Sequence, residues 1–166
     1  MTVLITTNMG NITVELDAEK APKTVANFLD YVAKGHYSNT IFHRVIADFM
    51  VQGGGFEPGM KQKPADQQVE NEAKNGLKND KYTLAMARTS DPHSASAQFF
   101  INTKNNAFLD YPGQDGWGYT VFGKVISGQD VVDKIKGVVV DDVRGQQNVP
   151  VVPIVVKSAT LVKTVK

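Results

Sequence analysis

Apolar and polar residues alternate along the first sixteen positions of the chain, with one interruption in the middle. Val3 and Ile5 precede a Met9-Gly10 pair, and the alternation then resumes at Ile12, Val14 and Leu16. Alternation of this kind places apolar side chains on one face of a strand. A glycine between two alternating runs is typical of a hairpin turn. Residues 1–16 therefore predict a β-hairpin with one buried face.

The spacing of apolar residues then changes to three and four, which predicts a helix. It begins at Pro22, which suits a first helical turn, and ends at Gly35, which suits the position after the last turn. Its buried face is formed by Val25, Phe28, Leu29 and Val32. A second, shorter helix is expected over residues 128–137, with three residues facing inward: Val131, Val132 and Ile135.

Strands are expected elsewhere at residues 40–46, 49–52, 82–88, 97–103, 119–126 and 151–165. In the last strand the apolar parity switches between Val156 and Ala159, which predicts a bulge or bend near Ser158. Residues 53–80 are rich in Gly, Pro, Asn and Lys and are interpreted as a long surface loop. Further loops are expected before residues 119 and 151.

This order of elements predicts one mainly β domain over residues 1–166, with about eight strands and two helices. Closing a sheet into a barrel removes its free edges. We therefore expect a closed eight-stranded antiparallel β-barrel with helices over its open ends. A two-sheet sandwich fits the alternation as well.

Composition and charge exclude several classes of protein. The chain has 42% hydrophobic and 21% charged residues and a net charge of +1, so no basic field indicates nucleic acid as a partner. It has no cysteine, which removes thiol chemistry and disulfides. No stretch approaches the ~20 apolar residues of a membrane span, and the N-terminus lacks the features of a signal peptide. A cytoplasmic protein without membrane association is expected.

Several familiar kinds of site are poorly supported by the motifs. The run GGGFEPGMK lacks the GK[ST] ending of a phosphate loop, so its glycines indicate a bend or a close approach of a peptide. Ser94 and Ser96 lie near a histidine but outside any GxSxG motif. Glu70 and Glu72 are interpreted as solvated.

The three histidines are not spaced as metal ligands, so neither a metal nor another cofactor is expected. They are His36, His43 and His93. His43 precedes Arg44 on the predicted strand, so the two side chains point to opposite faces. A structural role is favoured for His43.

Arg44 offers a stronger hypothesis. Strand parity puts Arg44, Met50 and Gln52 on one face, with Phe49 facing away unless a bulge intervenes at residues 47–48. Gln98 and Phe100 share a face of a second strand. These residues include no nucleophile and no acid–base pair that titrates near pH 7. They suit a site that grips a neutral, partly apolar group and donates hydrogen bonds to it.

Rotation about an X–Pro peptide bond needs only these features. No bond breaks, and the barrier of ~18–20 kcal/mol is the amide resonance. A catalyst has to hold the proline ring in an apolar pocket and stabilise the twisted amide. A fixed guanidinium is suited to the second task because it is always charged and rigidly forked.

The segments FHRVIADFMVQGGG, LAMARTSDPHSASAQFFI and VFGKV resemble the cyclophilin family of peptidyl-prolyl isomerases, most closely its bacterial cytoplasmic members. The resemblance covers essentially the whole chain. It implies a barrel with two helices and a groove on its outer surface. It also implies that Arg44 and Gln52 are catalytic, and that substrate is bound by Phe49, Met50, Ala87, Arg88, Gln98, Phe100, Phe108, Leu109 and Tyr119.

Three of these positions depart from the best-known eukaryotic pattern. Phe108, Tyr119 and Arg88 stand where those members carry tryptophan, histidine and asparagine, respectively. The expected partners are proline-containing peptides and unfolded or partly folded proteins, with weak binding of cyclosporin. The chain is expected to be a monomer that assists protein folding. The alternative is a proline-peptide binding module or holdase without important turnover.

Overall fold

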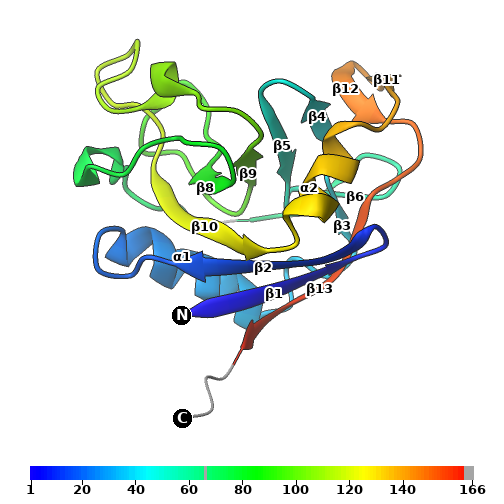
Figure 1. Ribbon diagram of the computed structural model, residues 1–166, viewed down its shortest axis with the longest axis horizontal. Coiled ribbons are helices and arrows are strands. Elements are labelled where there is room, and N and C mark those ends of the chain that lie inside the picture. The colour runs from blue at the N-terminus through cyan, green and yellow to red at the C-terminus, as the bar shows by residue number, and fades with distance from the viewer. Residues whose placement is uncertain (66, 163–166) are drawn as a thin grey trace.

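The computed structural model describes residues 1–65 and 67–162. Most of their strands belong to one strongly curled antiparallel sheet (Figure 1). Every neighbouring pair of strands in this sheet is antiparallel. The strand order is β3 (Thr40–Ile41), β13 (Val155–Val162), β1 (Thr2–Thr7), β2 (Gly10–Leu16), β10 (Val121–Ser127), β8 (Thr83–Met86), β9 (Phe99–Asn102), β5 (Met50–Gly53) and β4 (Arg44–Ile46).

The sheet has nine strands, where a closed barrel of eight was predicted. Its two edge strands, β3 and β4, are separated in the chain by only two residues, Phe42 and His43. The sequence predicted one strand over residues 40–46, and a break at these two residues divides it. The edges of the sheet therefore lie next to each other in the chain, but no pairing between β3 and β4 closes the described part of the barrel.

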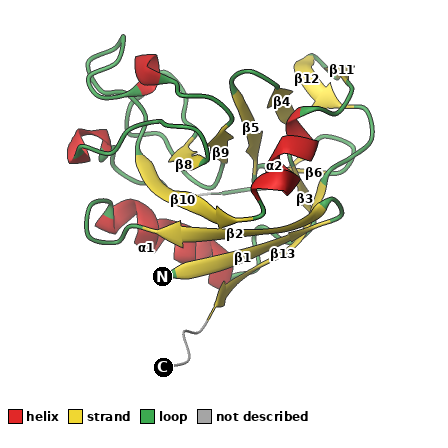
Figure 2. Cartoon of the chain, in the orientation of Figure 1, coloured by secondary structure: helices red, strands yellow, loops and turns green. Residues whose placement is uncertain are grey.

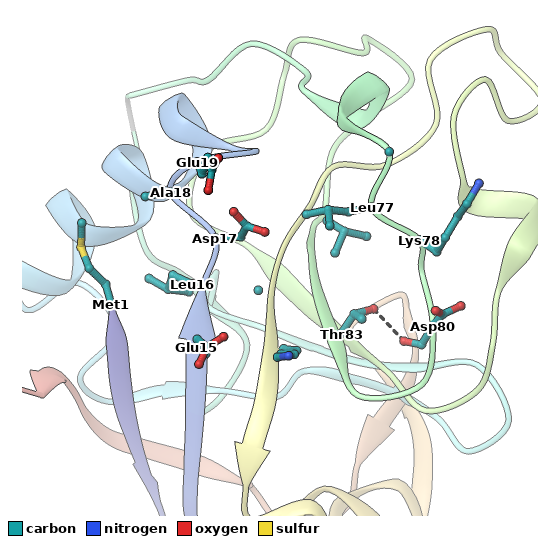
Figure 3. Close-up of a pocket in the computed structure, with 14 residues that line it drawn as sticks. Met1, Glu15, Leu16, Asp17, Ala18, Glu19, Leu77, Lys78, Asp80 and Thr83 are labelled. Atoms are coloured by element: carbon teal, nitrogen blue, oxygen red, sulfur yellow. Dashed lines mark hydrogen bonds between the residues drawn. The ribbon is translucent and has the colours of Figure 1, made fainter.

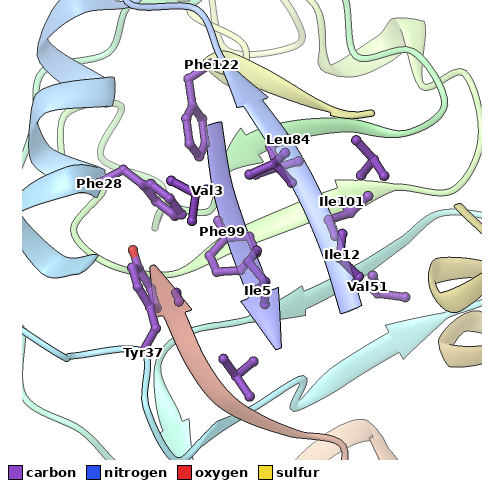
Figure 4. Packing of buried hydrophobic residues seen from close by; sticks show 14 of the residues in the cluster. Val3, Ile5, Ile12, Phe28, Tyr37, Val51, Leu84, Phe99, Ile101 and Phe122 are labelled. Carbon is purple, nitrogen blue, oxygen red and sulfur yellow. The ribbon is translucent and has the colours of Figure 1, made fainter. Parts of the chain in front are cut away.

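The predicted helices are present as α1 (Pro22–Ala33) and α2 (Gln129–Lys136) (Figure 2). Both bury the faces that the spacing predicted, because Val25 and Phe28 of α1 and Val132 and Ile135 of α2 belong to the main core. Figure 4 shows how Phe28 packs beside the aromatic rings of this core. Its ring centroid lies 5.0 Å from that of Tyr37 and 5.2 Å from that of Phe122.

The last strand carries an irregularity close to the predicted bulge. Thr6 pairs with Ser158, whereas Thr7 pairs with Val156, so the residue between them on β13 has no partner on β1. The change of apolar parity is thus confirmed within one residue. The strand ends at Val162 in the described chain, and residues 163–165 of the predicted strand lie outside the described residues.

Two short hairpins occupy segments that were predicted as loops. They are β6–β7 (Phe56–Glu57 and Lys61–Gln62) and β11–β12 (Val140–Val143 and Gln146–Pro150). In the second hairpin, Arg144 and Gly145 both have positive φ, at 49° and 80°. The Arg-Gly pair was a usable signal for this turn. The flanking strands were not predicted, because they are half-exposed and show too little alternation of apolar and polar residues. None of the described helices is both long and apolar enough to cross a membrane.

Candidate active site

Three neighbouring strands place Arg44, Gln52 and Phe100 in one row across the sheet. Gln52 of β5 pairs with Arg44 of β4 on one side and with Phe100 of β9 on the other. Residues paired directly across a sheet point to the same face. The row lies on the outer face, because the intervening Val51 and Ile101 belong to the main core. The alternation of these strands therefore separates the core from the candidate site.

A second, smaller apolar cluster lies beneath this row on the outer face of the sheet. Its buried members are Met50, Ala85, Phe100, Leu109 and Val121. Above it is a pocket of about 130 Å³, small enough for a single side chain. Nine of the eleven residues expected at the site line this pocket: Arg44, Phe49, Met50, Gln52, Ala87, Arg88, Phe100, Leu109 and Tyr119.

The position of Phe49 is explained by a turn, without the bulge that parity seemed to require. Ile46 and Met50 form the last pair of the β4–β5 hairpin, so Phe49 belongs to its three-residue loop. The backbone N–H of Phe49 donates to the carbonyl oxygen of Ile46 at 2.9 Å. The predicted start of the strand at residue 49 was therefore one residue early, and the turn directs Phe49 toward the pocket.

Gln98 lies beside the pocket and supports Gln52. The Gln52 Nε2 donates to the Gln98 Oε1 at 2.9 Å. Gln98 rests on bare backbone, because a Cβ at Gly55 would stand only 2.5 Å from its side-chain carbons. The glycine run therefore accommodates side chains of its own chain. Sequence reasoning considered a bend or the approach of a peptide and did not foresee this role.

Phe108, like Gln98, is an expected site residue that does not line the pocket. Its side chain is 54% exposed, and its ring centroid lies 5.7 Å from that of Phe49. It follows Ala107 in the short 3₁₀ helix η2 (Ala107–Leu109), whose last residue does line the pocket. Phe108 thus meets the site at the ring of Phe49.

The two arginines of the pocket differ in their surroundings. Arg44 is exposed, and among the described residues its guanidinium takes part in no hydrogen bond, ion pair or cation–π contact. The side chain of Arg88 is only 3% exposed and forms an ion pair with Asp115. All donors of the Arg44 guanidinium are therefore free for a ligand, whereas each nitrogen of the Arg88 guanidinium is engaged within the chain.

His43 is buried, but it lies in the break between β3 and β4, where the parity argument for its direction does not apply. Its exposure is 4%, and its ring centroid lies 4.6 Å from that of Phe56. Burial, and secondarily the charge of Arg44, lower the pKa of His43 to about 4. Its Nδ1 has no hydrogen-bond partner in the described chain. These features describe a neutral core histidine.

Glu72 departs from the solvated role that the sequence suggested. Its Oε1 accepts hydrogen bonds from both the backbone N–H and the hydroxyl of Thr24, each at 2.7 Å. Glu70 instead forms an exposed ion pair with Lys23 at 2.6 Å. Glu72 therefore satisfies the N-terminus of α1, where the chain provides no side-chain N-cap of its own.

A larger hollow of the described surface lies elsewhere. It has a volume of about 740 Å³, and its walls come from the segments around Asp17, Lys78 and Lys124 (Figure 3). The hollow mixes acidic and basic side chains, and its rim includes the hydrogen bond from the Thr83 hydroxyl to the Asp80 carbonyl. None of the residues expected at the site lines this hollow.

Comparison with known proteins relates residues 2–161 to one family. They match the family described as cyclophilin type peptidyl-prolyl cis-trans isomerase. A peptidyl-prolyl cis-trans isomerase of Streptomyces antibioticus is 60% identical over 96% of this chain and 98% of its own. Peptidyl-prolyl cis-trans isomerase B of Escherichia coli is 57% identical over 93% of this chain and 96% of its own.

The fold is likewise similar to a solved structure. A cyclophilin of Cryptosporidium parvum, crystallised in the presence of the dipeptide Ala-Pro, superposes with a TM-score of 0.84. It is 30% identical in sequence, and the match covers 99% of this chain and 100% of the other. The likeness extends over the curled sheet and the elements that surround it.

Proposed function

Because the chain belongs to the cyclophilin-type peptidyl-prolyl cis-trans isomerase family, we propose that the pocket beside Arg44 is its active site. The protein is a peptidyl-prolyl cis-trans isomerase, and its reaction rotates X–Pro peptide bonds. One observation above all supports this site: an unpaired guanidinium stands over a small apolar pocket. The assignment of individual roles below is part of the proposal.

The apolar floor binds the proline ring. Met50, Phe100 and Leu109 are between 1% and 7% exposed, so their positions are fixed by packing before a ligand arrives. A ring held in this way cannot rotate with the rest of the peptide. Rotation then has to occur on the side of the residue before proline, which remains in the open part of the groove.

Arg44 stabilises the twisted amide. As the X–Pro bond turns, resonance is lost and the proline nitrogen regains its lone pair. A guanidinium N–H that donates to this nitrogen binds the twisted state more strongly than the planar one. This difference in binding lowers the barrier, since only interactions that strengthen in the transition state accelerate the reaction.

Gln52 positions the peptide relative to Arg44. Its amide nitrogen is engaged by Gln98, which leaves its carbonyl oxygen available as an acceptor. Because Gln52 is the direct cross-strand partner of Arg44, the two side chains leave the sheet side by side on the same face. It can accept from the substrate backbone or hold the guanidinium in its working orientation.

The test is exchange spectroscopy by NMR on a short X–Pro peptide, with and without a catalytic amount of the protein. Catalysed exchange between the cis and trans signals is expected at protein concentrations far below that of the peptide. A binding module or holdase would broaden or shift the signals in proportion to the bound fraction without accelerating exchange. That result would reject the active-site proposal in favour of the alternative.

The partners and location follow from the same reasoning. We propose that the clients are proline-containing segments of unfolded or partly folded proteins, because a pocket for one ring recognises little beyond the X–Pro unit. A monomer in the cytoplasm is proposed, which a chain without cysteine suits because it needs no disulfide to fold. Weak cyclosporin binding is proposed because Phe108 offers no N–H donor, and titration calorimetry would measure it.

A further inference from the structure

All sides of the Arg88 guanidinium are engaged by one surface loop and its surroundings. Its Nη2 lies 2.6 Å from the Asp115 Oδ2 and donates to the Gly118 carbonyl oxygen at 3.0 Å. The Nε also donates to Gly118, at 3.3 Å, and the Nη1 donates to the carbonyl oxygen of Thr89 at 3.0 Å. Such a set of contacts uses the fork geometry that only arginine has.

The loop held by Arg88 begins and ends at residues of the pocket. The backbone N–H of Tyr119 donates to the carbonyl oxygen of Leu109 at 2.9 Å, which closes the base of the loop. At Gly118 a Cβ would stand 2.8 Å from the same oxygen, so the two ends of the loop lie in close contact. Movement of the loop would therefore displace Leu109 and Tyr119, which line the pocket.

Asp115 connects the tip of the loop to both of these features. One of its carboxylate oxygens accepts from the backbone N–H groups of Trp117 and Gly118, at 3.0 and 3.2 Å. The other oxygen receives Arg88. The Asp115 carboxylate thus closes the turn at the tip of the loop and joins this tip to Arg88, which follows the pocket residue Ala87. Nothing in the sequence pattern indicated Asp115, because the segment PGQDGWG carries only generic turn signals.

Arg88 also supports the aromatic wall of the pocket directly. Its guanidinium carbon lies 4.4 Å from the centroid of the Tyr119 ring. The Tyr119 ring in turn meets the Phe100 ring edge-on, with centroids 5.9 Å apart. The Arg88 guanidinium therefore packs against the Tyr119 ring, which forms one side of the pocket above its apolar floor.

We propose that Arg88 is a positioning residue for the isomerase reaction, which holds the 110–119 loop and the Tyr119 ring against the bound proline. This inference rests on the proposed function. In this role Arg88 forms no polar bond to the substrate, and Arg44 alone provides the donor for the twisted amide. A wall that holds the proline ring contacts the ground state and the transition state alike. Its loss therefore raises KM and leaves kcat nearly unchanged.

The test compares Arg88→Asn with Arg144→Asn, a matched substitution in the exposed turn of the β11–β12 hairpin. Arg88→Asn should raise KM about tenfold, the equivalent of one lost charge-assisted hydrogen bond, with kcat within about twofold. Arg88→Lys should not restore KM, since a single ammonium cannot reach Asp115, Gly118 and Thr89 together. Arg144→Asn should leave both constants unchanged.

Trp117 provides a second measurement, independent of turnover. It is the chain's one tryptophan, and its ring lies 4.5 Å from that of His93. Acrylamide quenching of its fluorescence should increase in Arg88→Asn and, more weakly, in Asp115→Asn, which keeps the loop's backbone bonds but lacks the second charged oxygen. Asp115→Asn also serves as the test if Arg88→Asn does not fold.

The two proposals fail in different ways. A wild-type protein that does not accelerate X–Pro exchange contradicts the proposed function, whatever the variants do. An active wild type whose Arg88→Asn variant keeps its KM and its Trp117 quenching contradicts only the positioning role. A variant that loses kcat with KM unchanged also overturns the positioning role, because Arg88 would then act on the reacting amide.

Discussion

Single side chains decide what the pocket can do through the partners that they have or lack. Arg44 and Arg88 belong to the same residue type and line the same pocket. Arg44 has no partner within the described chain, whereas Arg88 is held by a carboxylate and two backbone carbonyl groups. The family resemblance implied a catalytic Arg44 and a substrate-binding Arg88, but it did not reveal the ion pair of Arg88, because Asp115 is distant in the chain.

The first prediction concerns Arg44→Ala. Turnover should fall by roughly 10²–10³, because one preorganised donor to the developing charge contributes about 3–4 kcal/mol. Affinity for an X–Pro peptide should change little, because the apolar floor and Gln52 remain. Exchange NMR measures the first quantity and peptide titration the second. Equal losses of affinity and turnover would contradict a role of Arg44 in the transition state.

The second prediction concerns pH and His43. Turnover should be nearly constant from about pH 6 to 8, because arginine side chains in general are charged throughout this range and His43, with its pKa lowered to about 4, stays neutral. The free energy of unfolding should depend on pH instead. The unfolded chain binds a proton at His43 near pH 6.5 and the folded chain only near 4, so the free energy of unfolding decreases as pH falls through this window.

The loss attributable to His43 approaches roughly 3 kcal/mol at the acid end, as an upper bound. Denaturant titrations at several pH values would measure it, with His43→Gln as the control that abolishes this part of the slope. An inflection of turnover near pH 6.5 that His43→Gln removes would show instead that the histidine takes part in the reaction.

At the scale of elements, the helix α1 depends on a residue from a distant loop. Helices usually satisfy their first N–H groups with a side chain just before the first turn. Here the preceding residue is Ala21, and Glu72 provides the acceptor from 48 positions away. The backbone N–H of Glu72 itself donates to the Thr120 hydroxyl at 2.9 Å, next to the pocket residue Tyr119.

The third prediction is that Glu72→Ala destabilises the protein by about 1–2 kcal/mol, the usual cost of a lost N-cap. Glu72→Gln should retain part of this stability because its amide oxygen can still accept. Glu70→Ala is the matched control, since its ion pair with Lys23 is exposed and surface pairs contribute little. Equal effects of the alanine variants in chemical denaturation would show that Glu72 is not a helix cap.

Helices and strands with one buried face were predictable from the sequence. Segments whose course depends on a turn were less predictable. The hairpin β1–β2, both helices and the parity of β5 and β9 follow from the spacing of apolar residues, because burial imposes that spacing. The position of Phe49 depended on a three-residue turn that periodicity does not encode. The anchoring of loops by Glu72 and Asp115 depended on tertiary contacts, which one sequence does not reveal.

At the scale of the whole molecule, the described residues form two apolar clusters, on opposite faces of the same sheet. The larger one fills the inside of the curled sheet and includes both helices, while the smaller one forms the floor of the pocket. Adjacent residues alternate between them, as Phe99 and Ile101 do with Phe100. The sheet therefore provides a rigid support for the pocket. The two clusters are built on the same strands but consist of different residues.

The fourth prediction tests this separation through Phe28→Ala. Phe28 is fully buried between Tyr37, Phe99 and Phe122, so its truncation should cost about 3–5 kcal/mol of stability. Turnover per folded molecule, measured at low temperature, should change less than about twofold, because no pocket residue contacts the cavity. A loss of turnover as large as that of Arg44→Ala would show that the inner core positions the site.

The pairing of β1 with β13 has a consequence for biosynthesis. Thr2 lies opposite Val162, so β1, which is translated before the other strands of the sheet, is flanked on one side by β13, which is translated after them. A nascent chain can form the β1–β2 hairpin early, but that edge of β1 stays open until β13 has left the exit tunnel. The sheet can therefore be completed only once β13 has followed the other eight of its strands out of the ribosome.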